Sequence, residues 1–497
     1  MYYKSTRNSA VGVTASQAIA MGISQDGGLF VPDSMPWFSY DDLRELANES
    51  YVKRAAVVLG GFLTDFTAQE LEDCCATAYT REKFETDSIA PIYMLENNLY
   101  LLELWHGPTC AFKDLALQLL PQLLSHAMAK TGAQEKTAAV LVATSGDTGK
   151  AALEGFRDSA GSRIIVFYPE QGVSRIQKLQ MQTQEGDNVS VCAIRGNFDD
   201  AQRGVKAIFA DDAVKDTLAR RGMFLSSANS INWGRLVPQI AYYVSCYCDL
   251  IKNGRIACGE HINVVVPTGN FGNILAAYYA KKCGIPINRL ICASNANNVL
   301  TEFIKTGIYS RNRPFYTTIS PSMDILISSN LERLLFDLSG CDDEKLRGWM
   351  TSLAADGRYE VDAPVKERLR EHFSAGFCSD DGTRATIKSL YERYNYICDP
   401  HTAVALNVYE QYRSLTGDGT KTVVASTASP FKFASDVLEA VKGTPAQGDD
   451  FAMVNELAAL SMLNAPRQLL QIREKPLRFT ENCEVGQMKD FVLQSLA

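Results

Sequence analysis

Short runs of apolar, mostly β-branched residues recur along the chain from residue 138 onward, and segments of helical periodicity separate most of them. We interpret six of these runs as strands, at residues 138–143, 163–168, 189–194, 262–266, 290–293 and 421–425. Because the runs are continuously apolar rather than alternating, each strand is expected to be buried on both faces. The pattern predicts an α/β protein with wound, mostly parallel sheets that are covered by helices.

The N-terminal part of the chain is mostly helical in pattern, and Thr67 followed by Glu70 predicts a capping box at the start of one helix. A chain of 497 residues also exceeds the size at which one hydrophobic core keeps growing. We predict a small, mainly helical N-terminal domain over residues 1–92, a main region over 93–460 and a C-terminal tail over 461–497 that packs on the core. The main region should contain two α/β subdomains, the smaller at roughly 125–230.

Charge and composition argue against several classes of protein. The chain has 49 Lys and Arg against 57 Asp and Glu, a net charge of −8, without a basic cluster, so we expect no binding to nucleic acid. No apolar run reaches the roughly 18 residues that a membrane span needs, and the first residues lack the apolar core of a secretory signal. We therefore expect a soluble, cytoplasmic protein that does not bind a membrane.

Cysteine and histidine usage predicts no metal site. The 13 cysteines include no Cys-x-x-Cys pair, and the 5 histidines lack paired ligand spacing. Several cysteines, such as Cys246 and Cys248, lie in apolar segments. We interpret them as buried free thiols of a reducing compartment.

The most informative segment, residues 106–114, reads HGPTCAFKD and places a lysine directly after a turn. An apolar run over 99–105 predicts an extended approach, and residues 115–124 have helical periodicity. Lys113 then lies near the positive end of a helix, where a cation is disfavoured by roughly 0.3 to 1 kcal/mol. Its amine should lose a proton readily and act as a nucleophile, although an ordinary solvated lysine fits the local pattern as well.

Three loops rich in small and polar residues follow predicted strands, where ligands bind in α/β sheets. The first, residues 144–150, reads TSGDTGK and runs into a helix, so its backbone N–H groups favour a bound anion. It is not a nucleotide P-loop, which needs glycine in place of Thr144 and a hydroxyl in place of Ala151. An ordinary capped turn remains an alternative.

The second loop, residues 267–273, reads PTGNFGN, and its two glycines allow the backbone to wrap closely around a phosphate. A dinucleotide fingerprint needs further glycines at Phe271 and Ile274, so a Rossmann dehydrogenase is not expected. The third loop, residues 426–430, reads STASP and offers hydroxyl groups at a strand end. Plain loop geometry and a helix cap remain the alternatives for these two loops.

The order of these motifs resembles the threonine synthase family, within the pyridoxal phosphate enzymes of the tryptophan synthase β-subunit fold (fold type II). The resemblance covers nearly the whole chain, beginning with Ser16-Gln17-Ala18 and the GGLFVP segment at 27–32, which look like the small N-terminal domain of that family. The further motifs, in order, are HGPTCAFKDLALQLL, ATSGDTG, SANSINWGRLVPQ, VPTGNFGN, SMDIL, DPHTAVA and STASPFKF. Ser429 stands where the family usually has histidine, and Cys110 stands where leucine is common. The chain also lacks the N-terminal extension of the plant enzymes that S-adenosylmethionine activates, so no such control is expected.

The resemblance implies a cofactor, pyridoxal 5'-phosphate, bound as a Schiff base to Lys113 in the catalytic region 93–460. It also implies that Thr427 meets the pyridine nitrogen of the cofactor. The residues expected to hold the cofactor phosphate are Gly269, Asn270, Phe271, Gly272 and Asn273. The implied reaction converts O-phospho-L-homoserine and water to L-threonine and phosphate, the last step of threonine biosynthesis, which makes the chain a carbon–oxygen lyase.

The substrate carries a carboxylate and a phosphate, so further anion-binding residues are expected. Those placed around the substrate, near its carboxylate, are Ser145, Gly146, Asp147 and Thr148. The backbone N–H of Asp147 is the better donor, since its carboxylate would repel that of the substrate. Asn232 and Arg235 are hypothesised to bind the substrate phosphate, because guanidinium groups bind phosphate bidentately.

Two other functions remain open. A threonine or serine dehydratase of the same cofactor group would act on the free amino acid and release ammonia without phosphate. A catalytically silent relative would bind the cofactor or a phosphorylated ligand as a signalling or interaction module. Either a monomer or a homodimer is compatible with the pattern, which has no sustained heptad repeat.

Overall fold

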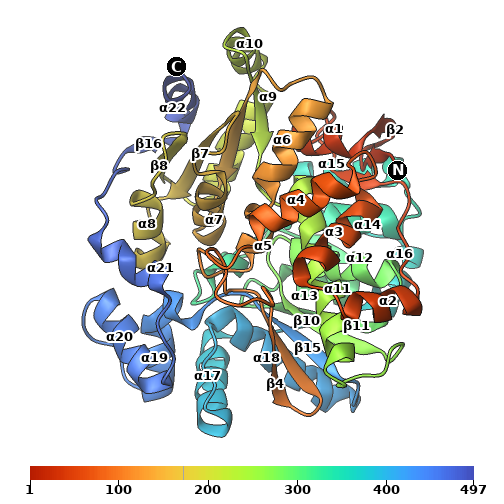
Figure 1. Cartoon of the computed structure of the whole chain (residues 1–497), viewed down its shortest axis with the longest axis vertical. Coiled ribbons are helices and arrows are strands. Elements are labelled where there is room, and N and C mark those ends of the chain that lie inside the picture. The colour runs from red at the N-terminus through yellow and green to blue at the C-terminus, as the bar shows by residue number, and fades with distance from the viewer. Residues whose placement is uncertain (172) are drawn as a thin grey trace.

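The computed structural model describes residues 1–171 and 173–497, and two sheets organise it (Figure 1). The larger sheet has six strands in the order β14-β11-β10-β15-β5-β4. Its pairs are parallel except that of β4 with β5. The strands are β4 Ile92–Glu96, β5 Leu99–Glu103, β10 Ile262–Pro267, β11 Ile287–Ser294, β14 Phe373–Phe377 and β15 Thr422–Ser426.

The smaller sheet has five parallel strands in the order β16-β8-β7-β6-β9. They are β6 Thr137–Ala143, β7 Ser162–Pro169, β8 Val189–Arg195, β9 Met223–Ser227 and β16 Asn482–Glu484. All six strands expected from apolar runs are present in the two sheets, so the predicted fold class is confirmed. Strand β16 comes from the C-terminal tail and pairs with β8, so the tail completes this sheet.

Helices cover the faces of both sheets, and two of them replace the single helix expected over 115–124 (Figure 1). Pro121 lies at the start of α6, and its missing N–H cannot continue the ladder from α5. The helices around the sheets are α5 Lys113–Leu117, α6 Leu120–Lys130, α7 Asp147–Phe156, α8 Arg175–Gln182, α9 Phe198–Ala210, α10 Asp212–Arg220, α11 Trp233–Lys252, α12 Gly272–Lys282, α13 Val299–Thr306 and α18 Pro400–Thr416.

Further short strands and helices follow residue 307. The strands β12 Ile308–Ser310 and β13 Arg358–Glu360 form a short antiparallel pair. In the chain, α14 and α15 lie between these two strands, and α16 follows β13. The helices are α14 Leu331–Leu338, α15 Asp343–Asp356, α16 Ala363–His372, α17 Asp380–Tyr394, α19 Ala434–Lys442, α20 Asp450–Ser461, α21 Arg467–Leu470 and α22 Met488–Ser495. Single 3₁₀ turns lie at Pro321–Met323, Pro430–Phe433, Gln471–Glu474 and Val485–Gln487.

The N-terminal segment forms a three-stranded antiparallel sheet with four helices and packs on α11 (Figure 1). Thr67 and Glu70 form the capping box of α4, as predicted. Trp233 of α11 is fully buried, and its ring lies 5.2 Å from that of Tyr3. The elements are β1 Tyr3–Ser5, β2 Asn8–Val13, β3 Phe30–Pro32, α1 Ala15–Met21, α2 Tyr40–Ala47, α3 Tyr51–Phe62 and α4 Ala68–Ala78. This segment therefore shares a hydrophobic core with the main region.

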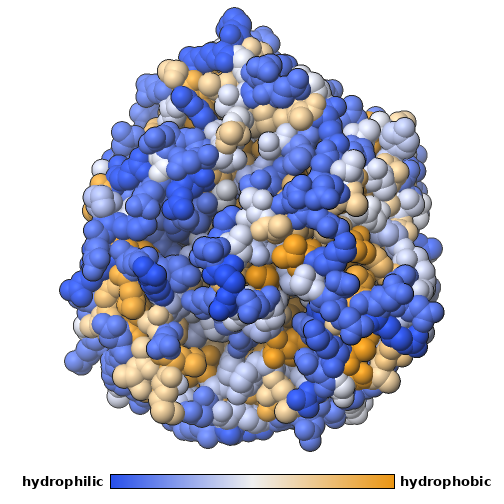
Figure 2. Space-filling view, viewed as in Figure 1, coloured by the Kyte–Doolittle hydropathy of each residue, from blue (hydrophilic) through white to orange (hydrophobic). Residues whose placement is uncertain are grey.

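The visible surface is mostly hydrophilic. Hydrophilic residues cover most of the face shown in Figure 2, and hydrophobic residues gather in smaller patches, mostly in its lower half. None of the helices in the described part of the chain combines the length and the apolar character needed to cross a membrane.

Candidate active site

Lys113 is the first residue of α5, and its side chain is buried inside the protein. Only 9% of that side chain is exposed. Its Nζ atom lies 3.3 Å from Oδ2 of Asp147 and 3.4 Å from Oγ of Ser322. Cys110, three residues earlier, has a φ of 58°, a left-handed conformation that costs a non-glycine residue about 1 to 3 kcal/mol. The turn expected before Lys113 therefore aims the amine inward.

Burial lowers the pKa of Lys113, and repulsion from Lys432 and Arg235 adds to that effect, while the charge of Asp147 opposes it. The direction is the one expected from sequence, but the reason differs. Helix α5 has only five residues, so its dipole is small, and loss of water around the ammonium is the main cause. The amine of Lys113 is thus closer to its neutral, nucleophilic form than a surface lysine.

The loop after β6 brings Asp147 to the amine. The hydroxyl of Thr144 accepts hydrogen bonds from the backbone of Gly146 and Gly149, which fixes the turn into α7. Gly146 has a φ of 138°, which side-chain-bearing residues rarely adopt. Asp147 follows as the first residue of α7, and 2% of its side chain is exposed.

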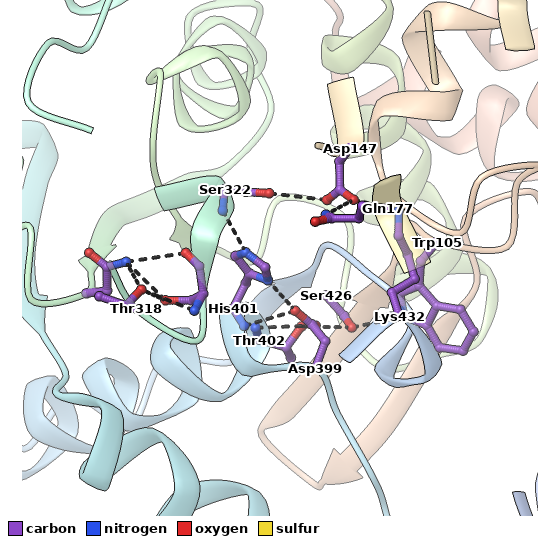
Figure 3. A network of polar contacts seen from close by, with 12 residues as sticks. Trp105, Asp147, Gln177, Thr318, Ser322, Asp399, His401, Thr402, Ser426 and Lys432 are labelled. Carbon is purple, nitrogen blue, oxygen red and sulfur yellow. Dashed lines mark hydrogen bonds and ion pairs between the residues drawn. The ribbon is translucent and has the colours of Figure 1, made fainter. Parts of the chain in front are cut away.

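Asp147 is the centre of a buried polar network, most of which Figure 3 shows. Its Oδ1 atom lies 2.5 Å from Nζ of Lys432 and accepts a hydrogen bond from Gln177. Its Oδ2 atom accepts from Ser322. Burial would raise the pKa of Asp147, but the charges of Lys432 and Lys113 outweigh it and hold that pKa well below its ordinary value. Asp147 is therefore an anion in a dry site.

The loop after β10 contains the two glycines and closes on the same region. A Cβ atom at Gly269 would lie 2.4 Å from the carbonyl oxygen of Ser322, so no other residue fits there. Phe271, with a φ of 63°, turns the chain into α12. The oxygen of the Asn273 amide accepts hydrogen bonds from Tyr242 and Tyr243. The Nδ2 atom of Asn273 is buried without a hydrogen-bond partner among the described residues.

The loop after β15 lies directly against the segment that leads to Lys113. Ala111 and Ala428 form a single antiparallel bridge, and the N–H of Phe112 donates to the carbonyl of Thr427 at 2.8 Å. Thr427 itself is buried. The structure thus brings Lys113 together with all three loops that were singled out as strand-end candidates.

Several polar residues of this site were not predicted as site residues. Nε2 of His401 accepts a hydrogen bond from the backbone N–H of Ser322, and its Nδ1 atom lies 2.7 Å from Oδ1 of Asp399 (Figure 3). This contact fixes the ring tautomer with the proton on Nδ1. Lys432 donates to the carbonyl of Thr109 besides its pair with Asp147. All of them belong to motifs noted in the sequence, SMDIL, DPHTAVA and STASPFKF, but local patterns gave no sign that these segments meet.

Asn232 and Arg235, the two residues expected at the substrate phosphate, differ in whether they have a free hydrogen-bond donor. Asn232 caps α11 with its side-chain oxygen and donates its Nδ2 hydrogens to the carbonyls of Ile19 and Ser227. The expectation that Asn232 binds substrate is therefore not supported, because no donor is left. Arg235 donates from Nη1 to the carbonyl of Ala228, and its buried Nε has no partner among the described residues. Burial lowers the pKa of Arg235 to about 10.

A cavity of about 1240 Å³ lies beside this site, between the N-terminal segment, α9 and the region around β12. Ser230, Asn270 and Ser328 are among its lining residues, and the hydroxyl of Ser328 donates to the carbonyl of Gly269. Lys113 is not among the lining residues. The cavity therefore borders the glycine loop and is large enough to admit a small molecule to it.

Family models match nearly the whole chain. "Threonine synthase N terminus" matches residues 2–79, "Pyridoxal-phosphate dependent enzyme" matches 90–428, and "Threonine synthase, C-terminal" matches 402–492. The chain therefore belongs to the pyridoxal-phosphate-dependent enzymes of fold type II.

Individual relatives narrow this class. The chain is 35% identical over 523 residues to threonine synthase of Saccharomyces cerevisiae, covering 100% of this chain and 98% of that protein. A crystal structure of threonine synthase from Brucella melitensis with bound PLP superposes with a TM-score of 0.86 at 36% identity, covering 100% of this chain and 99% of that one. The chain belongs to the threonine synthase family.

A second group of relatives is longer than this chain. Human "Threonine synthase-like 1" is 42% identical over 437 residues, which make up 86% of this chain but 58% of that protein. The chain thus spans less than two thirds of the length of these relatives.

The residues present fit pyridoxal phosphate. A buried amine with a lowered pKa suits the aldehyde. The Nδ2 of Asn273, unpaired among the described residues, and the close backbone at Gly269 suit a phosphate. Ser322 contacts both Lys113 and Gly269.

Proposed function

We propose that the protein is a threonine synthase that converts O-phospho-L-homoserine and water to L-threonine and phosphate. The observation that carries the proposal is the buried amine of Lys113, which lies among three strand-end loops that offer anion-binding groups. Two phosphates and one carboxylate must be held when cofactor and substrate are both bound. Several anion sites around one amine are what this reaction requires.

Lys113 binds the cofactor aldehyde and, once the substrate amine has taken its place, moves protons. The lowered pKa leaves a neutral amine that removes a proton first from Cα and then from Cβ of the substrate. When bound, pyridoxal phosphate supplies an electron sink for the charge that remains on carbon. After the phosphate has left, Lys113 returns one proton to Cγ. Water then adds at Cβ, its second proton passes to the released phosphate, and the other proton held by Lys113 returns to Cα to complete threonine.

The loops orient the reactants around that amine. Gly269, Asn270, Phe271, Gly272 and Asn273 hold the cofactor phosphate through backbone N–H groups and through the Nδ2 of Asn273, which has no partner in the described part of the chain. The hydroxyl of Thr427 meets the pyridine nitrogen. The residues from Ser145 to Thr148 surround the substrate carboxylate with backbone donors. Arg235 is the remaining candidate for the substrate phosphate, and burial strengthens its charge–charge contacts.

The site of action is part of the proposal. We place the enzyme in the cytoplasm because the thirteen cysteines are all free thiols and eleven of them are buried, as expected in a reducing compartment. It would act as a monomer or a homodimer on small molecules, without nucleic acid or membrane.

The test is an assay of the purified protein with pyridoxal phosphate and O-phospho-L-homoserine, in which phosphate and threonine are measured together. Equal amounts of both products are expected. Phosphate without threonine would contradict the addition of water at Cβ. Ammonia release from free threonine, with no turnover of the phosphorylated substrate, would identify a dehydratase instead, and no turnover of either would identify a silent relative.

A further inference from the structure

Lys432 is a second lysine at the site, and it lies deeper than Lys113. Its side chain is 0% exposed, and it comes from the short 3₁₀ turn that follows the loop after β15. Nζ lies 2.5 Å from Oδ1 of Asp147 and donates to the carbonyl of Thr109 at 3.0 Å. A wholly buried ammonium is rare in proteins and is retained only where a partner balances its charge.

Two lysines thus share one carboxylate. Lys432 lies 2.5 Å from one oxygen of Asp147, and Lys113 lies 3.3 Å from the other. Away from water, charges at such distances interact strongly, and one carboxylate balances one ammonium. Because Lys432 makes the closer contact and has no exit to solvent, it is the cation that Asp147 neutralises.

Bonding of the cofactor aldehyde requires that Lys113 be a neutral amine. The lone pair of a neutral amine attacks the aldehyde carbon, the carbonyl oxygen leaves as water, and a protonated amine has no lone pair to react. A carboxylate alone beside Lys113 would hold the amine as an ammonium. When Lys432 already balances the charge of Asp147, this carboxylate stabilises the protonated form of Lys113 much less.

We propose that Lys432 is a positioning residue that acts as the counter-ion of Asp147 and thereby keeps the amine of Lys113 free to bond the cofactor. The inference rests on Lys113 being the cofactor lysine, as proposed above. Lys432 itself does not react. It acts through Asp147, on which Gln177 and Ser322 also converge.

The other charges around the amine do not replace Lys432. Arg235 of α11 adds repulsion to Lys113, but it makes no contact with Asp147 within the described residues. The carboxylate of Asp114 of α5 accepts hydrogen bonds from the backbone N–H and the hydroxyl of Thr109, and burial raises the pKa of Asp114 to about 6. His401 of α18 is bound to Asp399 and to the backbone of Ser322. Lys432 is therefore the cation in direct contact with the Asp147 carboxylate besides Lys113.

The experiment measures how the rate at which full-length protein, freed of cofactor, bonds added pyridoxal phosphate depends on pH, followed by the absorbance of the product. In Lys432→Met the pH midpoint should rise by at least about one unit, so that bonding near neutral pH is about tenfold slower. Lys432→Arg retains the charge and should stay near the original profile. Lys345→Met removes an exposed lysine that pairs with Asp362 and is the matched control.

Two further variants separate charge from folding. Asp147→Asn removes the carboxylate and should move the midpoint to lower pH, the opposite direction to Lys432→Met. The double variant Asp147→Asn, Lys432→Met removes both charges of the Asp147–Lys432 pair and should bond the cofactor faster than Lys432→Met alone. If Lys432→Met does not fold, the double variant is compared with the wild type and with Asp147→Asn instead. If Lys432 balances Asp147, removal of both charges should leave the profile near that of the wild type, and a profile equal to that of Asp147→Asn would contradict the proposal.

An unchanged profile in Lys432→Met, or a double variant as slow as the single one, would overturn the proposal. Failure of the proposed function would be observed in a different experiment, because it concerns the unmodified protein. In that case the wild type would bond the cofactor at a residue other than Lys113, or would form no threonine, whatever its pH profile.

Discussion

Gly269 faces the carbonyl oxygen of Ser322 so closely that a Cβ atom at position 269 would lie 2.4 Å from it. The contact is between two backbones, so no side-chain rotation relieves it. It joins the glycine loop to the segment whose hydroxyl lies 3.4 Å from the Lys113 amine. The relative position of the proposed phosphate site and the reactive amine thus depends on this one glycine.

Gly269→Ala should therefore weaken the binding of pyridoxal phosphate by about tenfold or more, because the loop must shift away from Ser322. Equilibrium dialysis against the cofactor measures the effect. Gly419→Ala is the control, since nothing lies within 4 Å of a Cβ atom there and its affinity should not change. Equal affinity in both variants would show that the glycine loop does not hold the cofactor.

Asn232→Ala should reduce stability rather than substrate binding. The side chain caps α11 and satisfies two backbone carbonyls, and loss of such a cap costs about 0.5 to 2 kcal/mol. Thermal unfolding should shift to lower temperature while KM for O-phospho-L-homoserine stays the same. A raised KM with unchanged unfolding would restore the original hypothesis for this residue.

Replacement of Arg235, unlike that of Asn232, should change substrate binding. Arg235→Met removes a buried guanidinium whose Nε is unpaired within residues 1–171 and 173–497. It should raise KM for the phosphorylated substrate by about tenfold or more, in the range of a charge-assisted hydrogen bond. Arg235→Lys retains the charge but not the second donor and should give an intermediate KM. Initial rates over a range of substrate concentrations measure both. Unchanged KM in Arg235→Met assigns the substrate phosphate elsewhere.

His106 should make stability depend on pH. Burial opposes its charge, but hydrogen bonds to Glu103 and Glu85 outweigh burial and raise the pKa of His106 to about 9. A raised pKa means that protonated His106 stabilises the folded protein fully below about pH 6.5, and that this contribution is lost as the pH rises through about 9, up to about 3 kcal/mol.

His106→Asn should therefore lower the unfolding temperature clearly at about pH 6 and hardly at all at about pH 10. Thermal melts of both proteins over this range measure the difference. His126→Asn, at a half-exposed histidine with a longer contact of 3.6 Å to Glu70, is a suitable control. A difference that stays constant with pH would show that packing, not the charge of His106, stabilises the segment.

Continuous apolar runs predicted the strands because a buried parallel strand needs apolar residues on both faces. Strands β4, β9, β14 and β16 of the two main sheets were missed, as were the short strands outside them. β4 has no fully buried residue and β14 has two. β9 is only partly buried, and β16 is three residues long, with its two outer residues exposed, so neither makes a distinct apolar run. The single helix expected over 115–124 is two helices, and Pro121 was the signal that was overlooked.

The residues of the site also divide into those with a local sequence signal and those without one. Lys113 and the three loops each carry a local signal, an amine after a turn or small residues after a strand. Lys432 carries none, because what distinguishes it is its ion pair with Asp147, a residue far away in the chain. Asn232 had the residue type of a phosphate ligand, but in sequence an unoccupied amide cannot be told from one that caps a helix.

The most direct test that Lys113 carries the cofactor is reduction of the cofactor-bound protein with borohydride, followed by mass analysis of its peptides. Reduction makes a Schiff base permanent and marks the lysine that carries it. The mass of a pyridoxyl phosphate group should appear on Lys113, and the visible absorbance of the cofactor should be lost in Lys113→Ala. The group on Lys432, or an unchanged absorbance in Lys113→Ala, would contradict the account.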